Sequence, residues 1–478
     1  METRQTDVAI IGAGSAGLNA QRDVIRQGAR PLLIESGPYG TTCARVGCMP
    51  SKLLVAAADA AHAVTHSGVF GIELAGGYRV DGRAVMDRVR RERDRFVGFV
   101  VDSTEAIPSE QRLRGHACFL GPTTLQVGDH TRVESRAVIV ATGSQPFVPP
   151  PFDQIREHVM VNDDVFDLQD LPASVAVIGT GIIALELGQA LHRLGVEVAF
   201  FNPFDELGPF TDPAVKTVAE DVLTAELAIH RGVEIQRATP DGGHVQIDWL
   251  DRDGQKQQRK FERVLVAAGR RPNLAGLDLD KTGLPLDEGG LPPWNPRTAQ
   301  AGDQPIFLAG DVNRHLALLH EAADEGSIAA ANAVRYPDVD AHVRRTPLAI
   351  AFTDPQMGMV GLRFADLPED GFAVGEVSFA NQGRARVMAR NAGHVRIYAE
   401  TTGCRLIGAE MFGPSVEHLA HLLAWSVQRG LTVQDALSMP FYHPVLEEGL
   451  RTALRDLAKN LQVIGGCRSE DLVEAPGT

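Results

Sequence analysis

Two stretches of the chain share one pattern of hydrophobic and polar positions. Residues 7–36 and 174–203 each begin with a short apolar run, pass through a glycine turn into a segment with apolar residues at helical spacing, and end in a second apolar run. Short apolar runs bounded by turns favour buried strands, and the helical spacing favours a helix between them. The pattern therefore predicts two βαβ units, each with two parallel strands.

Both glycine turns have the spacing typical of a dinucleotide-binding site. The first turn holds Gly12, Gly14 and Gly17, and the second holds Gly179 and Gly181 with Ala184 in the third place. The first glycine allows the tight turn, the second lets a pyrophosphate approach the backbone, and the third allows close packing of helix on strand. A single fingerprint often marks only a tight turn, but two in full strand–turn–helix context predict two dinucleotide sites.

The rest of the pattern predicts where the chain passes between domains. A proline-rich stretch at 144–154 indicates a linker, and we expect a second crossing just after residues 264–273. From about Thr346, alternating strands such as His394–Glu400 are followed by helical patterns, which favours an α+β domain. The predicted fold class is α/β, with two Rossmann-like dinucleotide-binding domains and a C-terminal α+β domain.

Composition and charge exclude several classes of protein. A chain of 478 residues is too long for one core, and 44% hydrophobic with 22% charged residues is ordinary globular composition. No run reaches the roughly 18 apolar residues of a membrane span. The N-terminus leads directly into a strand without an apolar leader, so we expect the cytoplasm. A net charge of −15 without any basic run argues against nucleic acid as the main partner.

Two of the five cysteines, Cys43 and Cys48, lie close together ahead of an alanine-rich helical pattern. Five scattered cysteines are too few for a secreted disulfide framework, so the pair favours redox chemistry or metal binding. A zinc site would need further ligands nearby, and the nearest histidines, His62 and His66, fall on the predicted helix. Redox chemistry is therefore the stronger hypothesis, and we expect no metal.

The ordered motifs of the whole chain resemble the flavin-dependent pyridine nucleotide–disulfide oxidoreductases. Within that family the dihydrolipoyl dehydrogenases are closest, with glutathione and mercuric reductases as relatives. The matching stretches are the first glycine motif with Glu35, then residues 40–52, 138–144, 181–188, 267–273, 307–312, 352–361 and 442–449. So many motifs in one order are specific to the family and less specific to one substrate.

The resemblance implies cofactors, domain roles and partners. Residues 1–150 with 275–345 would bind FAD, residues 151–274 would bind NAD or NADP, and residues 346–478 would form a homodimer that completes each active site. Electrons would pass between a dithiol substrate and NAD(H) through a Cys43–Cys48 disulfide and FAD. A dihydrolipoyl substrate would be carried on a separate lipoylated protein.

The resemblance also assigns roles to single residues. Cys48 would exchange electrons with the flavin and Cys43 would react with the substrate thiol, while a partner's His443 oriented by Glu448 would move the proton. Lys52, paired with Glu186, would lie near the flavin. The FAD residues would be Gly12, Gly14, Gly17, Glu35, Thr42, Lys52, Thr142, Gly143, Gly310, Asp311, Leu319 and His320. The NAD(P) residues would be Gly179, Gly181, Ala184, Glu186, Asn202 and Gly269.

The cysteine pair also makes sense on its own chemistry. A two-electron carrier between flavin and thiol needs a reversible disulfide, and an offset of this length across a helix start keeps the two sulfurs within bonding range. The positive end of the helix would favour thiolate. The remaining cysteines, Cys118, Cys404 and Cys467, receive no role.

The second dinucleotide motif departs from the family pattern. Asn202 stands where an NAD-specific site usually has an acid, and residues 201–213 contain no Arg or Lys to hold a 2′-phosphate. The missing cations favour NAD, although Ala184 is typical of NADPH-using relatives. Asp205 would substitute for the missing acid if the loop folds back. Two alternatives stay open: an NADPH-dependent disulfide reductase of the glutathione or mercuric reductase kind, and an FAD-binding scaffold without catalysis.

Overall fold

The computed structural model describes residues 2–463, so Cys467 lies outside the described residues. The first predicted βαβ unit is present, with β2 (Val8–Ile11), α1 (Ser15–Arg26) and β3 (Pro31–Glu35). Every residue of β2 is buried, as expected for a strand covered on both faces of a parallel sheet. The sheet runs β19–β8–β2–β3–β4, in which the added strands are β8 (Ala137–Val140), β4 (Arg112–Arg114) and β19 (Ile306–Leu308).

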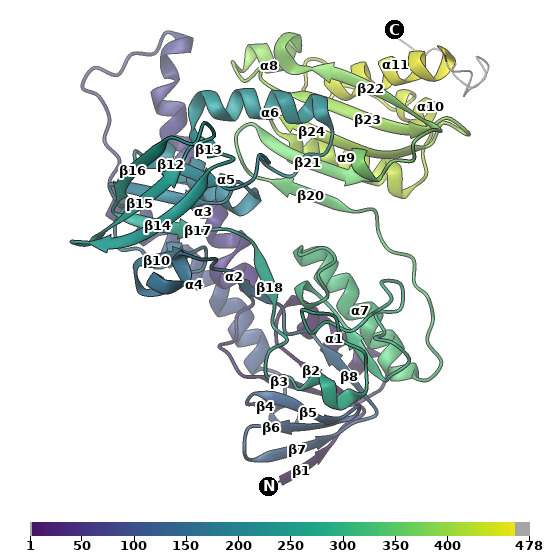
Figure 1. Ribbon diagram of the computed structural model, residues 1–478. Coiled ribbons are helices and arrows are strands. Elements are labelled where there is room, and N and C mark those ends of the chain that lie inside the picture. The colour runs from purple at the N-terminus through teal and green to yellow at the C-terminus, as the bar shows by residue number, and fades with distance from the viewer. Residues whose placement is uncertain (1, 464–478) are drawn as a thin grey trace.

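Further elements surround this first sheet (Figure 1). Helix α7 (Leu319–Arg335) packs against α1. The helices α2 (Thr42–Val46), α3 (Cys48–Thr65) and α4 (Gly82–Glu105) follow β3 in sequence. A small sheet contains β1 (Glu2–Gln5), β7 (Thr131–Glu134), β6 (Thr124–Val127) and β5 (Ala117–Gly121).

The second predicted βαβ unit is also present, with β11 (Ser174–Ile178), α5 (Ile182–Arg193) and β12 (Glu197–Asn202). Its parallel sheet runs β10–β17–β11–β12–β13, completed by β10 (Val159–Val161), β17 (Arg263–Val266) and β13 (Ala228–Arg231). Helix α6 (Pro213–Glu226) and the antiparallel strands β14 (Glu234–Asp241), β15 (His244–Leu250) and β16 (Lys256–Phe261) belong to the same region. Helix α3, which follows the first unit in sequence, packs on α5 of the second, which brings the two regions together.

The two crossings between these sheets lie side by side. Strand β9 (Ser144–Pro146) pairs with β18 (Arg270–Pro272) as a two-stranded antiparallel ribbon. The proline-rich stretch is therefore more ordered than a plain linker, and its Phe152 is buried at 1% exposure. The ribbon fixes where the chain leaves the first sheet and where it returns.

The C-terminal region is of α+β type, as predicted. Its antiparallel sheet runs β20–β21–β24–β23–β22, with β20 (Leu348–Ala351), β21 (Gln356–Gly361), β24 (Leu406–Gly413), β23 (His394–Glu400) and β22 (Phe372–Ser378). The helices are α8 (Gly383–Val387), α9 (Val416–Gln428), α10 (Val433–Leu437) and α11 (Glu448–Val463). Figure 1 shows an extended segment leading from α7 into β20. Among the helices within residues 2–463, none combines the length and apolarity needed to cross a bilayer.

Candidate active site

In the first glycine turn, Gly12 and Gly17 are tightly packed, whereas Gly14 borders open space. Gly12 has a φ of +110°, and a Cβ on it would lie 2.3 Å from the carbonyl oxygen of Ala141. A Cβ on Gly17 would lie 1.9 Å from the oxygen of Gly12, because the helix crosses the strand so closely. Gly14 has an ordinary φ of −81°, and nothing lies within 4 Å of its Cβ position. The space beside Gly14, at the start of α1, therefore fits the approach of a pyrophosphate.

The second turn repeats this arrangement with a looser third position. Gly179 has a φ of +110°, and its Cβ would lie 2.6 Å from the oxygen of Ala267. The Cβ position of Gly181 is open to 4 Å, like that of Gly14. Ala184 carries its methyl group in a fully buried position, so the third position of this turn has room for a side chain. The residues of both turns therefore fit dinucleotides.

Glu35 and Asn202, at the ends of β3 and β12, form hydrogen bonds with the neighbouring loops. Glu35 accepts hydrogen bonds from the backbone nitrogens of Ala13 at 2.7 Å and Gly37 at 2.6 Å. Asn202 is buried and donates to the hydroxyl of Thr180 at 2.7 Å and to the oxygen of Glu206 at 2.9 Å. Each side chain thus fastens the loop at the end of its strand.

Two arginines from other segments contact the loop after β12, which contains no Arg or Lys of its own. Arg231, at the end of β13, lies in register with Asn202 and donates to the backbone oxygen of Asp205 at 3.0 Å. Arg252, from the β15–β16 turn, forms an ion pair with the carboxylate of Asp205. The loop itself contains no Arg or Lys, as the sequence shows, and both arginines come from other segments: Arg231 from β13 and Arg252 from the β15–β16 turn. Arg231 also pairs with Glu220 at 2.7 Å.

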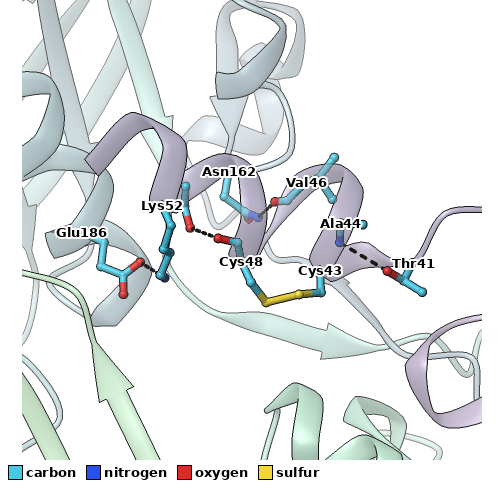
Figure 2. The surroundings of a disulfide bond; sticks show 9 residues. Thr41, Cys43, Ala44, Val46, Cys48, Lys52, Asn162 and Glu186 are labelled. Carbon is cyan, nitrogen blue, oxygen red and sulfur yellow. Dashed lines mark hydrogen bonds and ion pairs between the residues drawn. A yellow bond between two sulfur atoms is a disulfide. The ribbon is translucent and has the colours of Figure 1, made fainter. Parts of the chain in front are cut away.

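Cys43 and Cys48 form a disulfide with 4.8 Å between their Cα atoms (Figure 2). Cys43 belongs to the short helix α2, whose first turn is capped by the hydroxyl of Thr41, which accepts from the nitrogen of Ala44 at 3.3 Å. Cys48 is the first residue of α3. Cys48 therefore lies at the positive end of the α3 dipole, which favours a thiolate when the bridge opens.

A chain of hydrogen bonds connects α2, the helix of Cys43, with the ribbon of β9 and β18. Asn162 donates to the oxygen of Val46 in α2 at 3.4 Å and accepts from Arg270 at 3.3 Å. Arg270 donates to the hydroxyl of Ser144 at 2.9 Å, and that hydroxyl donates to Asp311 at 2.8 Å. Sequence reasoning gave Asn162 and Arg270 no role. The position of Arg270 in a family motif was a signal, whereas nothing in the sequence pointed to Asn162.

Lys52 and Glu186 form the predicted ion pair, with 2.7 Å between Nζ and Oε2 (Figure 2). Lys52 lies one turn after Cys48 in α3, and Glu186 lies in α5, so the packing of these helices creates the pair. The Glu186 side chain is only 6% exposed and that of Lys52 is 34% exposed. The second carboxylate oxygen of Glu186 accepts from the backbone nitrogen of Phe352 at 2.7 Å. The buried carboxylate is therefore satisfied on both oxygens.

One cavity of about 460 Å³ is lined by many of the predicted residues. They are Gly14, Thr42, Cys43, Cys48, Lys52, Gly143, Glu186, Gly310, Asp311, Leu319 and His320. The remaining predicted residues lie outside its lining: Gly12, Gly17, Glu35, Thr142, Gly179, Gly181, Ala184, Asn202, Gly269, His443 and Glu448. The disulfide, the ion pair and the first glycine turn therefore share one space.

The predicted proton-transfer pair lies elsewhere on the molecule. The Nδ1 atom of His443 lies 2.9 and 3.1 Å from the two carboxylate oxygens of Glu448, and the His443 side chain is 81% exposed. Glu448 also accepts from the nitrogen of Val445 at 3.1 Å. The hydrogen bond with His443 is the main cause that lowers the pKa of Glu448 below its usual value. An ionised carboxylate fixes the imidazole with its other nitrogen free for chemistry.

Two dinucleotide folds that meet at a disulfide define an oxidoreductase that couples nucleotide redox chemistry to thiol chemistry. The chain belongs to the pyridine nucleotide-disulphide oxidoreductases, because the model of that family matches residues 6–326. The model of the family's dimerisation domain matches residues 348–454. The protein is accordingly an FAD-dependent oxidoreductase that exchanges electrons between a pyridine nucleotide and a disulfide.

Several known proteins are similar over nearly the whole chain. A dihydrolipoyl dehydrogenase from Halobacterium salinarum is 31% identical, with 94% of this chain and 95% of that protein covered. A mercuric reductase from Staphylococcus aureus is 28% identical, with 96% of this chain and 84% of that protein covered. The crystal structure of LpdA from Mycobacterium tuberculosis superposes with a TM-score of 0.80 at 22% identity, covering 94% and 99% of the two chains. This last likeness concerns the fold alone.

Proposed function

We propose that the protein is a homodimeric dihydrolipoyl dehydrogenase, which oxidises a dihydrolipoyl group carried on a separate protein and reduces NAD⁺. The observation that carries the proposal is the Cys43–Cys48 disulfide in a cavity that also contains Gly14 and the Lys52–Glu186 pair. A dihydrolipoyl dehydrogenase at 31% identity over 94% of the chain supports the choice of substrate.

The proposal assigns the parts of the chain as the sequence suggested. Residues 1–150 and 275–345 hold FAD, with Gly14 at the pyrophosphate, Asp311 at the ribityl side and Leu319 with His320 at the start of α7. Residues 151–274 hold the nicotinamide nucleotide around Gly181, and residues 346–478 form the dimer. FAD, when bound, supplies the two-electron link between the dithiol and the nicotinamide.

The thiol chemistry belongs to the two cysteines. A substrate thiolate attacks Cys43, which breaks the Cys43–Cys48 bond, forms a mixed disulfide and leaves Cys48 as a thiolate at the N-terminus of α3. The second substrate thiolate then attacks the substrate sulfur of the mixed disulfide. The lipoyl ring closes and Cys43 leaves as a thiolate. The substrate loses two electrons and two protons, and the cysteine pair gains the electrons.

His443 takes one proton at a time in this proposal: it passes the first to the Cys43 thiolate and keeps the second, and it does so for the disulfide of the other subunit. Its side chain is 81% exposed and lies outside the cavity of its own chain, which supports a role across the dimer. Glu448 holds Nδ1 and leaves Nε2 free to take the thiol proton. The dimerisation domain supplies the contact that would bring His443 to the partner's cavity.

Steady-state kinetics test the substrate and the nucleotide together. We expect turnover with dihydrolipoamide and NAD⁺, and a kcat/KM for glutathione at least about 100-fold lower, because the cavity must fit the reacting dithiol closely. Lack of turnover with dihydrolipoamide and either NAD⁺ or NADP⁺ would reject the proposal.

A second candidate is the same machinery used as an NADPH-dependent disulfide reductase. The positions of Arg231 and Arg252 beside the loop after β12 favour it, because guanidinium groups are suited to a 2′-phosphate. Both arginines are, however, already paired with Asp205, and Arg231 also with Glu220. A reductase of this kind would oxidise NADPH faster than NADH in the presence of a disulfide substrate.

A further inference from the structure

The side chain of Phe352 contacts the ion pair that the cavity shares with the disulfide. The Nζ atom of Lys52 lies 4.5 Å from the centroid of the Phe352 ring, and the backbone nitrogen of Phe352 donates to Glu186 at 2.7 Å. Phe352 itself lines the cavity. One residue of the C-terminal region therefore contacts both members of the pair, the lysine through its ring and the glutamate through its backbone.

The backbone that carries this ring is fixed on one face of α5. Glu186, Gln189 and Arg193 are spaced so that they share a helix face, and all three bind the turn after β20. Gln189 accepts from the nitrogen of Asp354 at 2.8 Å and donates to its oxygen at 2.9 Å. Arg193, only 6% exposed, pairs with the Asp354 carboxylate at 2.9 Å. The ring of Phe352 is thus held at a defined place relative to α5.

The contact matters because the ion pair alone does not fix the ammonium group. Lys52 reaches Glu186 through a long, flexible side chain that is 34% exposed, and a single ion pair leaves such a side chain rotational freedom. An aromatic face attracts a cation through its quadrupole, and the attraction strengthens where water is excluded. The ring supplies a second point of attachment, and the two together define the position of the charge.

We propose that Phe352 is a positioning residue that holds the Lys52 ammonium group in the cavity and thereby sets the electrostatic potential felt by the bound flavin. The inference deepens the proposed function, because it depends on FAD binding in this cavity, but it does not depend on which thiol is the substrate. A fixed cation at this place favours the reduced, anionic form of the flavin.

The decisive test is the midpoint potential of the flavin in the purified holoenzyme, measured by equilibration with a reference dye. Phe352→Leu and Phe352→Met fill similar space without a π face, whereas Phe352→Tyr keeps it. We expect the equilibrium constant for flavin reduction to fall about three- to tenfold in the Leu and Met variants and to stay unchanged in the Tyr variant. A purely space-filling role would instead leave all three variants at the wild-type potential.

Two controls assign the effect to Lys52. In a Lys52→Met background the Phe352→Leu change should have no further effect on the potential, because the cation is already gone. Phe147→Leu removes a cation–π contact with Arg271 outside the cavity lining and should leave the potential unaltered. An equal fall in the Lys52→Met background, or the same fall in the Tyr variant, would overturn the inference. The measurement needs no thiol substrate, so it stands even if dihydrolipoamide proves inactive.

Discussion

Cys48 and Cys43 have the same side chain but lie at different positions on two different helices. It occupies the first position of an 18-residue helix, whereas Cys43 lies within a helix of 5 residues. A long helix with unpaired N–H groups at its start stabilises negative charge there. Once the disulfide is reduced, a thiolate is therefore more stable on Cys48 than on Cys43.

Serine substitutions at the two cysteines test this difference. In Cys43→Ser we expect turnover to fall by at least about 10³-fold, because no disulfide can form, while Cys48 remains as a thiolate beside the flavin. A long-wavelength absorbance band that persists in Cys43→Ser and is lost in Cys48→Ser would show this. Cys118→Ser, at a free cysteine of β5, should keep both the band and the activity. The assignment would be wrong if the band followed Cys43.

A second prediction at this scale concerns His62 in α3. Burial is the main cause that lowers its pKa to about 4, with smaller contributions from the nearby Arg193 and His66. The unfolded chain takes up this proton near the ordinary value of 6.5. The folded state therefore binds fewer protons between these two values. The stabilising contribution is complete above pH 6.5 and is lost as the pH falls toward 4.

Urea unfolding at pH 7 and at pH 5 measures this contribution. Wild-type protein should lose stability between the two values, and His62→Gln should lose about 1 kcal/mol less, after allowance for the partial exposure of the imidazole. An identical loss in both proteins would mean that His62 is as easily protonated in the folded state as in the unfolded chain.

At the scale of elements, the first βαβ unit separates two reasons for keeping a glycine. Gly17 is required by packing, since its Cβ would lie 1.9 Å from a backbone oxygen. Gly14 has an ordinary backbone and open space, so packing gives no reason for a glycine there, whereas the approach of a bound group does. We expect Gly17→Ala to lower the free energy of unfolding by about 1–3 kcal/mol or more. Gly14→Ala should leave the apoprotein stable and weaken FAD binding.

Urea unfolding of the apoprotein and FAD titration distinguish the two variants. The expected result is a normal unfolding midpoint for Gly14→Ala, combined with an FAD affinity reduced at least about tenfold, because the added methyl group occupies the pyrophosphate approach. If Gly14→Ala bound FAD normally, the space beside α1 would have another use.

The loop after β12 yields a prediction about nucleotide preference. Asp205 is one of the acids of this loop, and it pairs with Arg231 and Arg252. In Asp205→Asn the acid no longer repels a phosphate and both guanidinium groups become available, so kcat/KM for NADP⁺ should rise about tenfold relative to NAD⁺. Adding Arg252→Ala should remove the gain. An unchanged ratio in Asp205→Asn would place the 2′ position of the ribose away from this loop.

The elements also show why prediction from sequence succeeded in part. The two βαβ units and the C-terminal α+β region follow from local periodicity, so the amino-acid pattern alone predicts them. The pairing of β9 with β18 and the arrival of Arg231 and Arg252 depend on contacts between distant segments, for which local pattern holds no signal. At the site, motif resemblance led to Lys52 and Glu186, but the third partner, Phe352, became visible only through the packing of the segment after β20 on α5.

The whole molecule determines the final prediction, which is complementation between two inactive variants. If His443 serves the partner's disulfide, then Cys48→Ser and His443→Ala chains mixed after unfolding form hybrid dimers with one intact site. Random pairing makes half of the dimers hybrids, so roughly a quarter of wild-type activity should return. Refolded mixtures that stay inactive, with hybrid dimers verified by two affinity tags, would place His443 at the site of its own chain.

The strand order of the first sheet has a consequence for biosynthesis. Strand β8 pairs with β2 on one side and with β19 on the other, and all of residues 151–274 are translated between β8 and β19. Until Leu308 emerges from the ribosome, the outer edge of β8 has no strand to bind. The insert of residues 151–274 can complete its own five-stranded sheet before the first sheet receives β19. A nascent chain stalled before β19 therefore presents an open edge to chaperones and to other nascent chains, and release of that segment ends the exposure.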